Sequence, residues 1–110
     1  MSEPTTVPAS VRRYFELAPS PDTDAYFALF ADDALVEDEN LEHHGIAAIR
    51  TWRAAVPQVS YEITDVEPMP GGVTAAATIT GDFPGSPFAG LKFYFEHNED
   101  GRIRRLRIHP

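Results

Sequence analysis

The spacing of apolar residues along the chain changes once, near Pro57. Before this point, apolar residues recur at every third or fourth position, which is typical of helices with one buried face. The pattern predicts helices over residues 7–18, 21–30 and 46–56. Ser20 is a residue type that caps helices, so we expect it to begin the second one.

After Pro57 the period falls to two, which is typical of half-buried strands. A shorter strand is expected earlier in the chain, at residues 34–38. Helices followed by strands predict an α+β fold of one domain, residues 1–110, in which a curved antiparallel sheet packs on three helices around a cone-like cavity. The long strands are expected at residues 59–67, 73–83, 89–97 and 102–109.

Composition narrows the chemistry and the partners. Seventeen acidic residues against nine basic ones give a net charge of −8, which disfavours nucleic acid and anionic membranes as partners. No cysteine is present, so disulfides, thiolate nucleophiles and sulfur-bound zinc are excluded. The polar N-terminal segment lacks the features of a secretion signal, and we therefore expect a cytoplasmic protein.

Four arginines gather in the last predicted strand, in the run RIRRLRI. One interpretation is an exposed strand face whose arginines balance acids on neighbouring strands. The other is a binding site for an anion. The residues concerned are Arg102, Arg104, Arg105 and Arg107.

The stretch FADDALVEDE, residues 30–39, places acids on both sides of a short apolar run. If Ala34 and Val36 face the core, the period of two turns Asp38 inward as well. Asp32 and Asp33 are expected in an exposed turn after the second helix. A partly desolvated carboxylate is a better proton acceptor, so Asp38 is a candidate general base. The alternative is a strand-end aspartate that only bonds a nearby turn.

Tyr14 lies on the apolar stripe of the first predicted helix, so its ring should be buried. A buried phenol needs a hydrogen-bond partner, and a core tyrosine bonded to backbone or another side chain is one interpretation. The other is functional. A carboxylate and a phenol that point into one pocket could abstract a proton from carbon and stabilise the resulting enolate oxygen.

Adjacent histidines, His43 and His44, stand near Glu39 and Glu42 and invite a metal-binding interpretation. Neighbouring side chains in a strand or loop point apart, however. We therefore expect no metal and no cofactor.

The runs VRRYFELAPSPDTDAYFALFADDALVEDE and HGIAAIRTW resemble the bacterial ketosteroid isomerases. These belong to the nuclear transport factor 2-like superfamily, together with the SnoaL-like polyketide cyclases and limonene epoxide hydrolase. The resemblance is close from Val11 to Glu39, resumes at Gly45 and weakens in the C-terminal strands. It implies that Tyr14 donates a hydrogen bond to an enolate and that Asp38 moves a proton between carbons.

Two positions depart from the isomerase pattern. A second acid completes the oxyanion site in the isomerases, and Leu91 stands there in this chain. A tyrosine that supports the catalytic phenol is replaced by Arg53. If Arg53 points inward, it could favour the ionised form of Tyr14 or hold an anionic substrate. If it points outward, Tyr14 loses its support.

These observations predict an isomerase or cyclase that needs no cofactor, with Asp38 as base and Tyr14 as oxyanion donor. Its ligand would be a small hydrophobic carbonyl compound, and the outer face of the sheet, with Phe95 or Tyr94, would form a homodimer. A non-catalytic ligand-binding or dimerisation module of the same fold is the alternative, and epoxide hydrolysis is a third possibility. The substrate would be bound by Phe30, Trp52, Arg53, Leu91, Phe93, Leu106 and Ile108.

Overall fold

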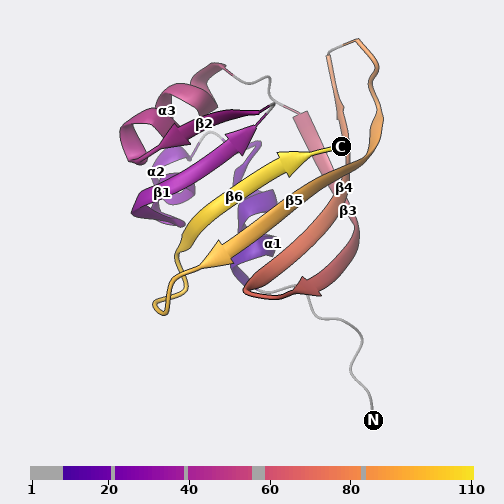
Figure 1. Ribbon diagram of the computed structural model, residues 1–110. Helices are drawn as coiled ribbons and strands as arrows, with labels where there is room; N and C mark the ends of the chain where they lie inside the picture. The colour runs from indigo at the N-terminus through magenta and orange to yellow at the C-terminus, as the bar shows by residue number, and fades with distance from the viewer. Residues whose placement is uncertain (1–8, 21, 39, 56–58, 83) are drawn as a thin grey trace.

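The computed structural model describes residues 9–20, 22–38, 40–55, 59–82 and 84–110. Within these ranges, the structure has three helices and one sheet of six strands (Figure 1). The helices are α1 (Ala9–Leu17), α2 (Thr23–Ala28) and α3 (Ile46–Ala55). The strands are β1 (Phe30–Asp38), β2 (Leu41–His44), β3 (Val59–Met69), β4 (Gly72–Gly81), β5 (Phe88–His97) and β6 (Ile103–His109).

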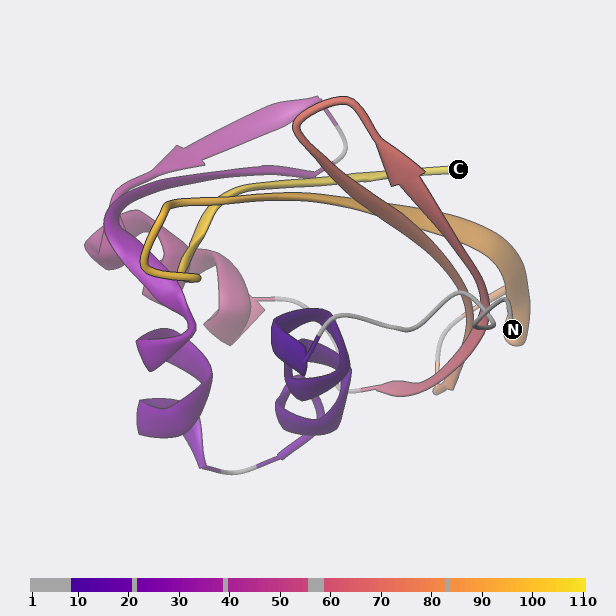
Figure 2. The same cartoon turned by 90° about the horizontal axis from the view of Figure 1, so that it is seen from below.

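All six strands join one sheet in the order β2-β1-β6-β5-β4-β3. The strands from β3 to β6 form an antiparallel meander, and β1 joins it by pairing in parallel with β6. The sheet curves around the helices, with α1 lying in its hollow (Figure 2). The predicted α+β architecture, a curved sheet over three helices, is confirmed. No helix of the described residues is long and apolar enough to cross a membrane.

The second helix is shorter than the apolar spacing predicted. Asp22 caps it, because its side chain accepts a hydrogen bond from the backbone nitrogen of Ala25, and the expectation that Ser20 is the cap was wrong. Ser20 instead accepts a hydrogen bond from the nitrogen of Asp22. The helix ends before Phe30 because that residue already pairs with Ile103 of β6.

Strand β1 therefore begins four residues earlier than predicted, at Phe30 instead of Ala34. Asp32 and Asp33 are exposed, but they lie within this strand, so their placement in a turn was wrong. The pairing of β1 with β6 shifts register between Phe30 and Leu35, which accommodates the two acids. Strand β2 was not predicted, since its mostly exposed residues show no apolar alternation.

Helix α1 covers the inner face of the sheet with its apolar stripe. The buried residues of this helix include Val11, Tyr14 and Phe15, as the helical spacing predicted. The Phe15 ring meets Phe93 of β5 edge to face, with 4.9 Å between ring centres. The predicted helix positions 7, 8, 21 and 56, and the predicted strand position 83, lie outside the described residues.

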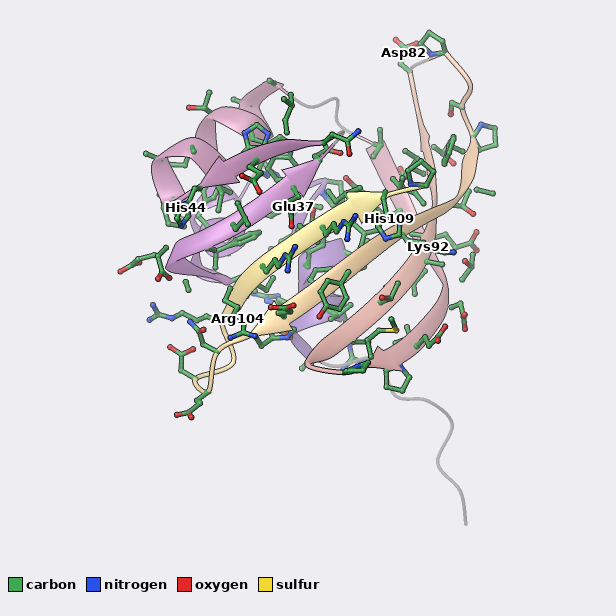
Figure 3. The ribbon with its side chains drawn as sticks, in the orientation of Figure 1. Glu37, His44, Asp82, Lys92, Arg104 and His109 are labelled. Carbon is green, nitrogen blue, oxygen red and sulfur yellow. The ribbon has the colours of Figure 1, made fainter. Side chains whose placement is uncertain are left out.

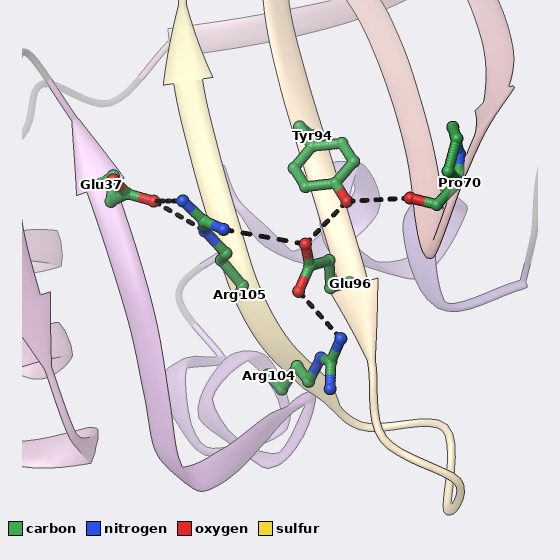
Figure 4. A network of polar contacts seen from close by, with 6 residues as sticks. All are labelled: Glu37, Pro70, Tyr94, Glu96, Arg104 and Arg105. Carbon is green, nitrogen blue, oxygen red and sulfur yellow. Dashed lines mark hydrogen bonds and ion pairs between the residues drawn. The ribbon is translucent and has the colours of Figure 1, made fainter.

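The outer face of the sheet carries a network of charges (Figure 4). Arg105 of β6 pairs with Glu37 of β1 at 2.7 Å and lies 3.8 Å from Glu96 of β5, and Arg104 pairs with Glu96 at 3.0 Å. Glu37 and Arg104 both project from the sheet (Figure 3). These pairs confirm for Arg104 and Arg105 the interpretation that the arginines balance acids on neighbouring strands, whereas Arg102 pairs with Asp100 in the preceding turn.

Gly72, at the start of β4, leaves no room for a side chain. A Cβ atom there would collide with the carbonyl oxygen of Phe95 on β5. We expect Gly72→Ala to lower the free energy of unfolding by about 1–3 kcal/mol, because the two strands must separate to accept the methyl group. Urea unfolding followed by circular dichroism measures this loss. Thr74→Ala, two residues along the same strand, is the control; an equal loss in both variants would contradict the prediction.

The outer network should make stability depend on pH. A hydrogen bond from Tyr94, together with the charges of Arg104 and Arg105, holds the pKa of Glu96 below its ordinary value of 4.5. The carboxylate therefore stabilises the fold above pH 4.5, and this contribution is lost as the pH falls through the lower folded-state pKa.

We expect Glu96→Gln to lower the free energy of unfolding at pH 7 by up to about 1 kcal/mol, with the difference from wild type shrinking below pH 4.5. Urea unfolding between pH 7 and pH 3 tests this. Glu99→Gln, in the exposed turn after β5, should leave stability unchanged. A difference that stays constant down to pH 3 would argue against the role of Glu96.

Candidate functional site

Several polar side chains gather inside the curved sheet, which is otherwise lined by apolar residues. We call them the interior polar cluster. They come from five different elements, so only the complete fold brings them together. The cluster consists of Tyr14 of α1, Tyr26 of α2, Asp38 of β1, Trp52 and Arg53 of α3, and Tyr61 of β3.

Asp38 ends β1 and lies half-buried on the face that also carries Ala34 and Val36. The indole nitrogen of Trp52 donates a hydrogen bond of 3.0 Å to its Oδ2 atom. Its Oδ1 atom makes no hydrogen bond to the residues that the structure describes. One carboxylate oxygen is thus fixed in position while the other is available to a ligand.

Tyr14 is almost completely buried, with 2% of its surface exposed. Its hydroxyl lies 3.5 Å from that of Tyr26, a long hydrogen bond. Burial raises the pKa of Tyr14 well above 10, and the neighbouring Tyr26, Tyr61 and Asp38 raise it further. Tyr14 therefore keeps its proton at neutral pH and can donate it in a hydrogen bond.

Tyr26 was not among the functional residues that the sequence predicted. It is 1% exposed and supplies the phenol that supports Tyr14. The available signal was the pair of adjacent aromatic residues at 26 and 27, both of which are buried in this short helix.

Arg53 points inward and closes the end of α1. Its Nη2 atom donates to the carbonyl oxygens of Ala18 at 2.8 Å and Ser20 at 3.0 Å, and lies 3.4 Å from that of Leu17. Its guanidinium carbon sits 4.4 Å from the centre of the Tyr26 ring. Arg53 therefore reaches Tyr14 through Tyr26.

Tyr61, on the edge strand β3, was also not predicted as a functional residue. In the sequence it appears only as one apolar position in an alternating strand. Its ring packs against Phe15 and Phe93, at 5.5 and 6.0 Å between centres. Burial raises the pKa of Tyr61, the charge of Arg53 lowers it and that of Asp38 raises it.

The predicted apolar lining lies in and around the core. Phe30, Phe93 and Leu106 are buried, and Leu91 and Ile108 are partly buried against the core. Ile108 stands directly beside Asp38 in the parallel pairing of β1 and β6. Phe30 lies at the opposite end of β1 from Asp38.

Among the described residues, two surface hollows stand out, and neither of these two includes Tyr14 or Asp38. One, of about 400 Å³, is lined by Asp24, Phe27, Ala28, Phe30, Asp32, Ile46, Arg50 and Arg102. The other, of about 270 Å³, is lined by Pro19, Val59, Ser60, Thr80 and Gly81.

A curved sheet that encloses helices and a few inward polar groups defines the nuclear transport factor 2-like class of domains. The SnoaL-like domain model matches residues 11–106, and the chain belongs to that family. No curated protein matches the chain closely enough to count as a relative.

Solved structures agree with this assignment. A proposed polyketide cyclase from Sinorhizobium meliloti is 37% identical, with 94% of this chain and 95% of that chain covered and a TM-score of 0.85. A protein of ketosteroid isomerase-like fold from Catenulispora acidiphila, in complex with trimethylamine, is 22% identical over 96% and 87% of the chains, with a TM-score of 0.80. A Mycobacterium tuberculosis protein in complex with estradiol-17beta-hemisuccinate is 16% identical over 92% and 90%, with a TM-score of 0.75.

The contacts of Arg53 predict a measurable role in stability. Arg53→Met keeps the apolar stem but removes the donors to the end of α1, so we expect the free energy of unfolding to fall by about 1.5–3 kcal/mol. Urea unfolding measures the loss, and hydrogen exchange should show faster opening of the last turn of α1. Arg50→Met, an exposed arginine of the same helix, is the matched control and should cost less than about 1 kcal/mol. Equal losses would contradict the capping role.

Proposed function

We propose that this protein is an isomerase or cyclase that removes a proton from carbon next to a carbonyl group of a small apolar ligand. Asp38 is the general base and Tyr14 the hydrogen-bond donor to the carbonyl oxygen. Family membership and the 37% identical proposed polyketide cyclase support the class of reaction.

The observation that carries the proposal is the state of the Asp38 carboxylate. Trp52 holds Oδ2 at 3.0 Å, while Oδ1 is not engaged by the described residues. The base is therefore oriented by an uncharged donor, and the oxygen left over can accept a proton.

The reaction needs only this chain's own groups. Oδ1 of Asp38 takes the proton, the carbon–hydrogen electron pair moves into the carbonyl group, and negative charge develops on the carbonyl oxygen. Tyr14, which keeps its proton at neutral pH, donates a hydrogen bond to that oxygen. In an isomerisation, Asp38 then returns the proton to another carbon of the conjugated enolate. In a cyclisation, the enolate carbon attacks the carbon of a second carbonyl group of the ligand, the π bond of that group opens, and its oxygen takes the proton back from Asp38.

The apolar body of the ligand would contact the side chains around this pair. Trp52 and Ile108 are neighbours of Asp38, as its hydrogen-bond donor and as its partner in the pairing of β1 with β6. The remaining contacts would come from Phe30, Arg53, Leu91, Phe93 and Leu106.

A homodimer through the outer face of the sheet and a cytoplasmic location remain parts of the proposal. Strand parity places Phe95 inside, with no exposed surface, so Tyr94 is the aromatic residue on the outer face. Its hydroxyl donates to Glu96 at 2.7 Å. A dimer formed there would meet charged groups as well as this ring.

The alternative is a binding module without catalysis. It is favoured by one observation: neither surface hollow includes Tyr14 or Asp38. Such a module would bind ligands without exchanging their protons.

Exchange of deuterium into a panel of enones and β-keto compounds distinguishes the two functions. We expect wild-type protein to catalyse exchange next to the carbonyl. Asp38→Asn should slow it by about 100- to 10,000-fold, and Tyr14→Phe by about 100- to 1000-fold. Nuclear magnetic resonance of the ligands follows the exchange.

Asp33→Asn, an exposed acid of the same strand, is the control and should leave the rate unchanged. Ligand binding without exchange would favour the binding module. Exchange that is insensitive to both Asp38 and Tyr14 would refute the assigned roles.

A further inference from the structure

We propose that Tyr61 is a second hydrogen-bond donor to the ligand, approaching the carbonyl oxygen from the sheet side while Tyr14 approaches from α1. This inference rests on the proposed function, which it deepens by naming a further residue of the same site. A second donor is needed because the residue at position 91 is Leu, whose side chain cannot donate a hydrogen bond.

The Tyr61 ring extends inward from the edge of the sheet. Tyr61 lies on β3, at the edge of the sheet, yet its ring reaches Phe93 on β5, with β4 in between. The inner face of β4 makes this possible because Ala75 and Ala77 carry only methyl groups there and are fully buried. The ring therefore points toward the middle of the sheet's hollow.

Tyr61 and Tyr14 share two aromatic neighbours. Tyr14 packs against Phe15 at 5.2 Å and Phe93 at 6.2 Å, and Tyr61 packs against the same two rings. The two phenols thus pack against one aromatic pair. Burial raises the pKa of Tyr61, and the charges of Arg53 and Asp38 act on it in opposite directions.

The Tyr61 hydroxyl makes no hydrogen bond to the described residues. If it were buried, it would be a buried polar atom without a partner, but among these residues the one such side-chain atom is Nε of Arg53. The Tyr61 hydroxyl is therefore accessible to solvent. A phenol with a partly buried ring and an accessible, unengaged hydroxyl is suited to meet a polar group of a ligand.

This arrangement compensates in part for Leu91. An apolar side chain at that position gives no donor, so an enolate oxygen held by Tyr14 alone would be poorly stabilised. Tyr61 keeps its proton at neutral pH because its pKa is raised, and it can donate without carrying charge.

The test uses 2-naphthol, a phenol that resembles an enol, and full-length protein. We expect Tyr61→Phe to weaken naphthol binding by about 10-fold, as the loss of one hydrogen bond predicts, while circular dichroism shows an unchanged fold. In protein labelled with carbon-13 at the tyrosine Cζ atom, the resonance that Tyr61→Phe removes should shift on saturation with naphthol. Tyr94→Phe, on the outer face, is the matched control and should bind naphthol as wild type does.

Unchanged affinity in Tyr61→Phe, or a Tyr61 resonance that does not move, would overturn the inference, as would wild-type protein that binds no naphthol. The proposed function is judged separately, by deuterium exchange. Exchange that depends on Asp38 while naphthol binding ignores Tyr61 defeats only the role of Tyr61. Naphthol binding that depends on Tyr61 in a protein without exchange supports the donor and defeats the catalytic function.

Discussion

The contact between the aromatic face of α1 and the inner face of β5 is the constraint on which the rest of the structure depends. Phe15 meets Phe93 at 4.9 Å and Tyr14 meets Phe95 at 5.3 Å, both edge to face. Each such pair contributes about 0.5–1.5 kcal/mol beyond the area it buries. The same contact fixes the rotation of α1 about its axis, and that rotation turns the Tyr14 hydroxyl toward α2 and the interior. Packing and chemistry are therefore set by one interface.

Arg53 donates hydrogen bonds to carbonyl groups at the end of α1. The C-terminal carbonyl groups of α1 end beside the interior, where water is scarce, and they need donors. Arg53 supplies them from α3 and lays its guanidinium over the Tyr26 ring at 4.4 Å. A lysine carries a point charge and lacks the planar group that can do both. The cation thereby joins three helices and supports the phenol that contacts Tyr14.

The spacing of apolar residues predicted the features that depend on neighbouring residues along the chain. The change of period near Pro57 gave the order of helices and strands, and strand parity put Asp38 on the side of Ala34 and Val36. This spacing could not predict contacts between segments that are distant in the sequence. The early start of β1 depends on Ile103, more than seventy residues away, and β2 is held by pairing with β1 while showing little apolar character. The roles of Arg53 and Tyr26 depend on side chains that meet across elements, which no spacing along the chain encodes.

The charges of the interior polar cluster indicate what kind of ligand fits the proposed site. Nη2 of Arg53 donates to the carbonyl oxygens of Ala18 and Ser20, just after α1, so this nitrogen is not available to an anionic ligand. Asp38 would repel such a ligand, and the phenols near it hold their protons because burial raises their pKa values. Neutral donors facing a carboxylate favour a molecule that enters uncharged and becomes an enolate only after Asp38 has accepted the proton. At that moment the negative charge leaves the base and appears on the ligand oxygen, where uncharged phenols can stabilise it without having attracted anions beforehand.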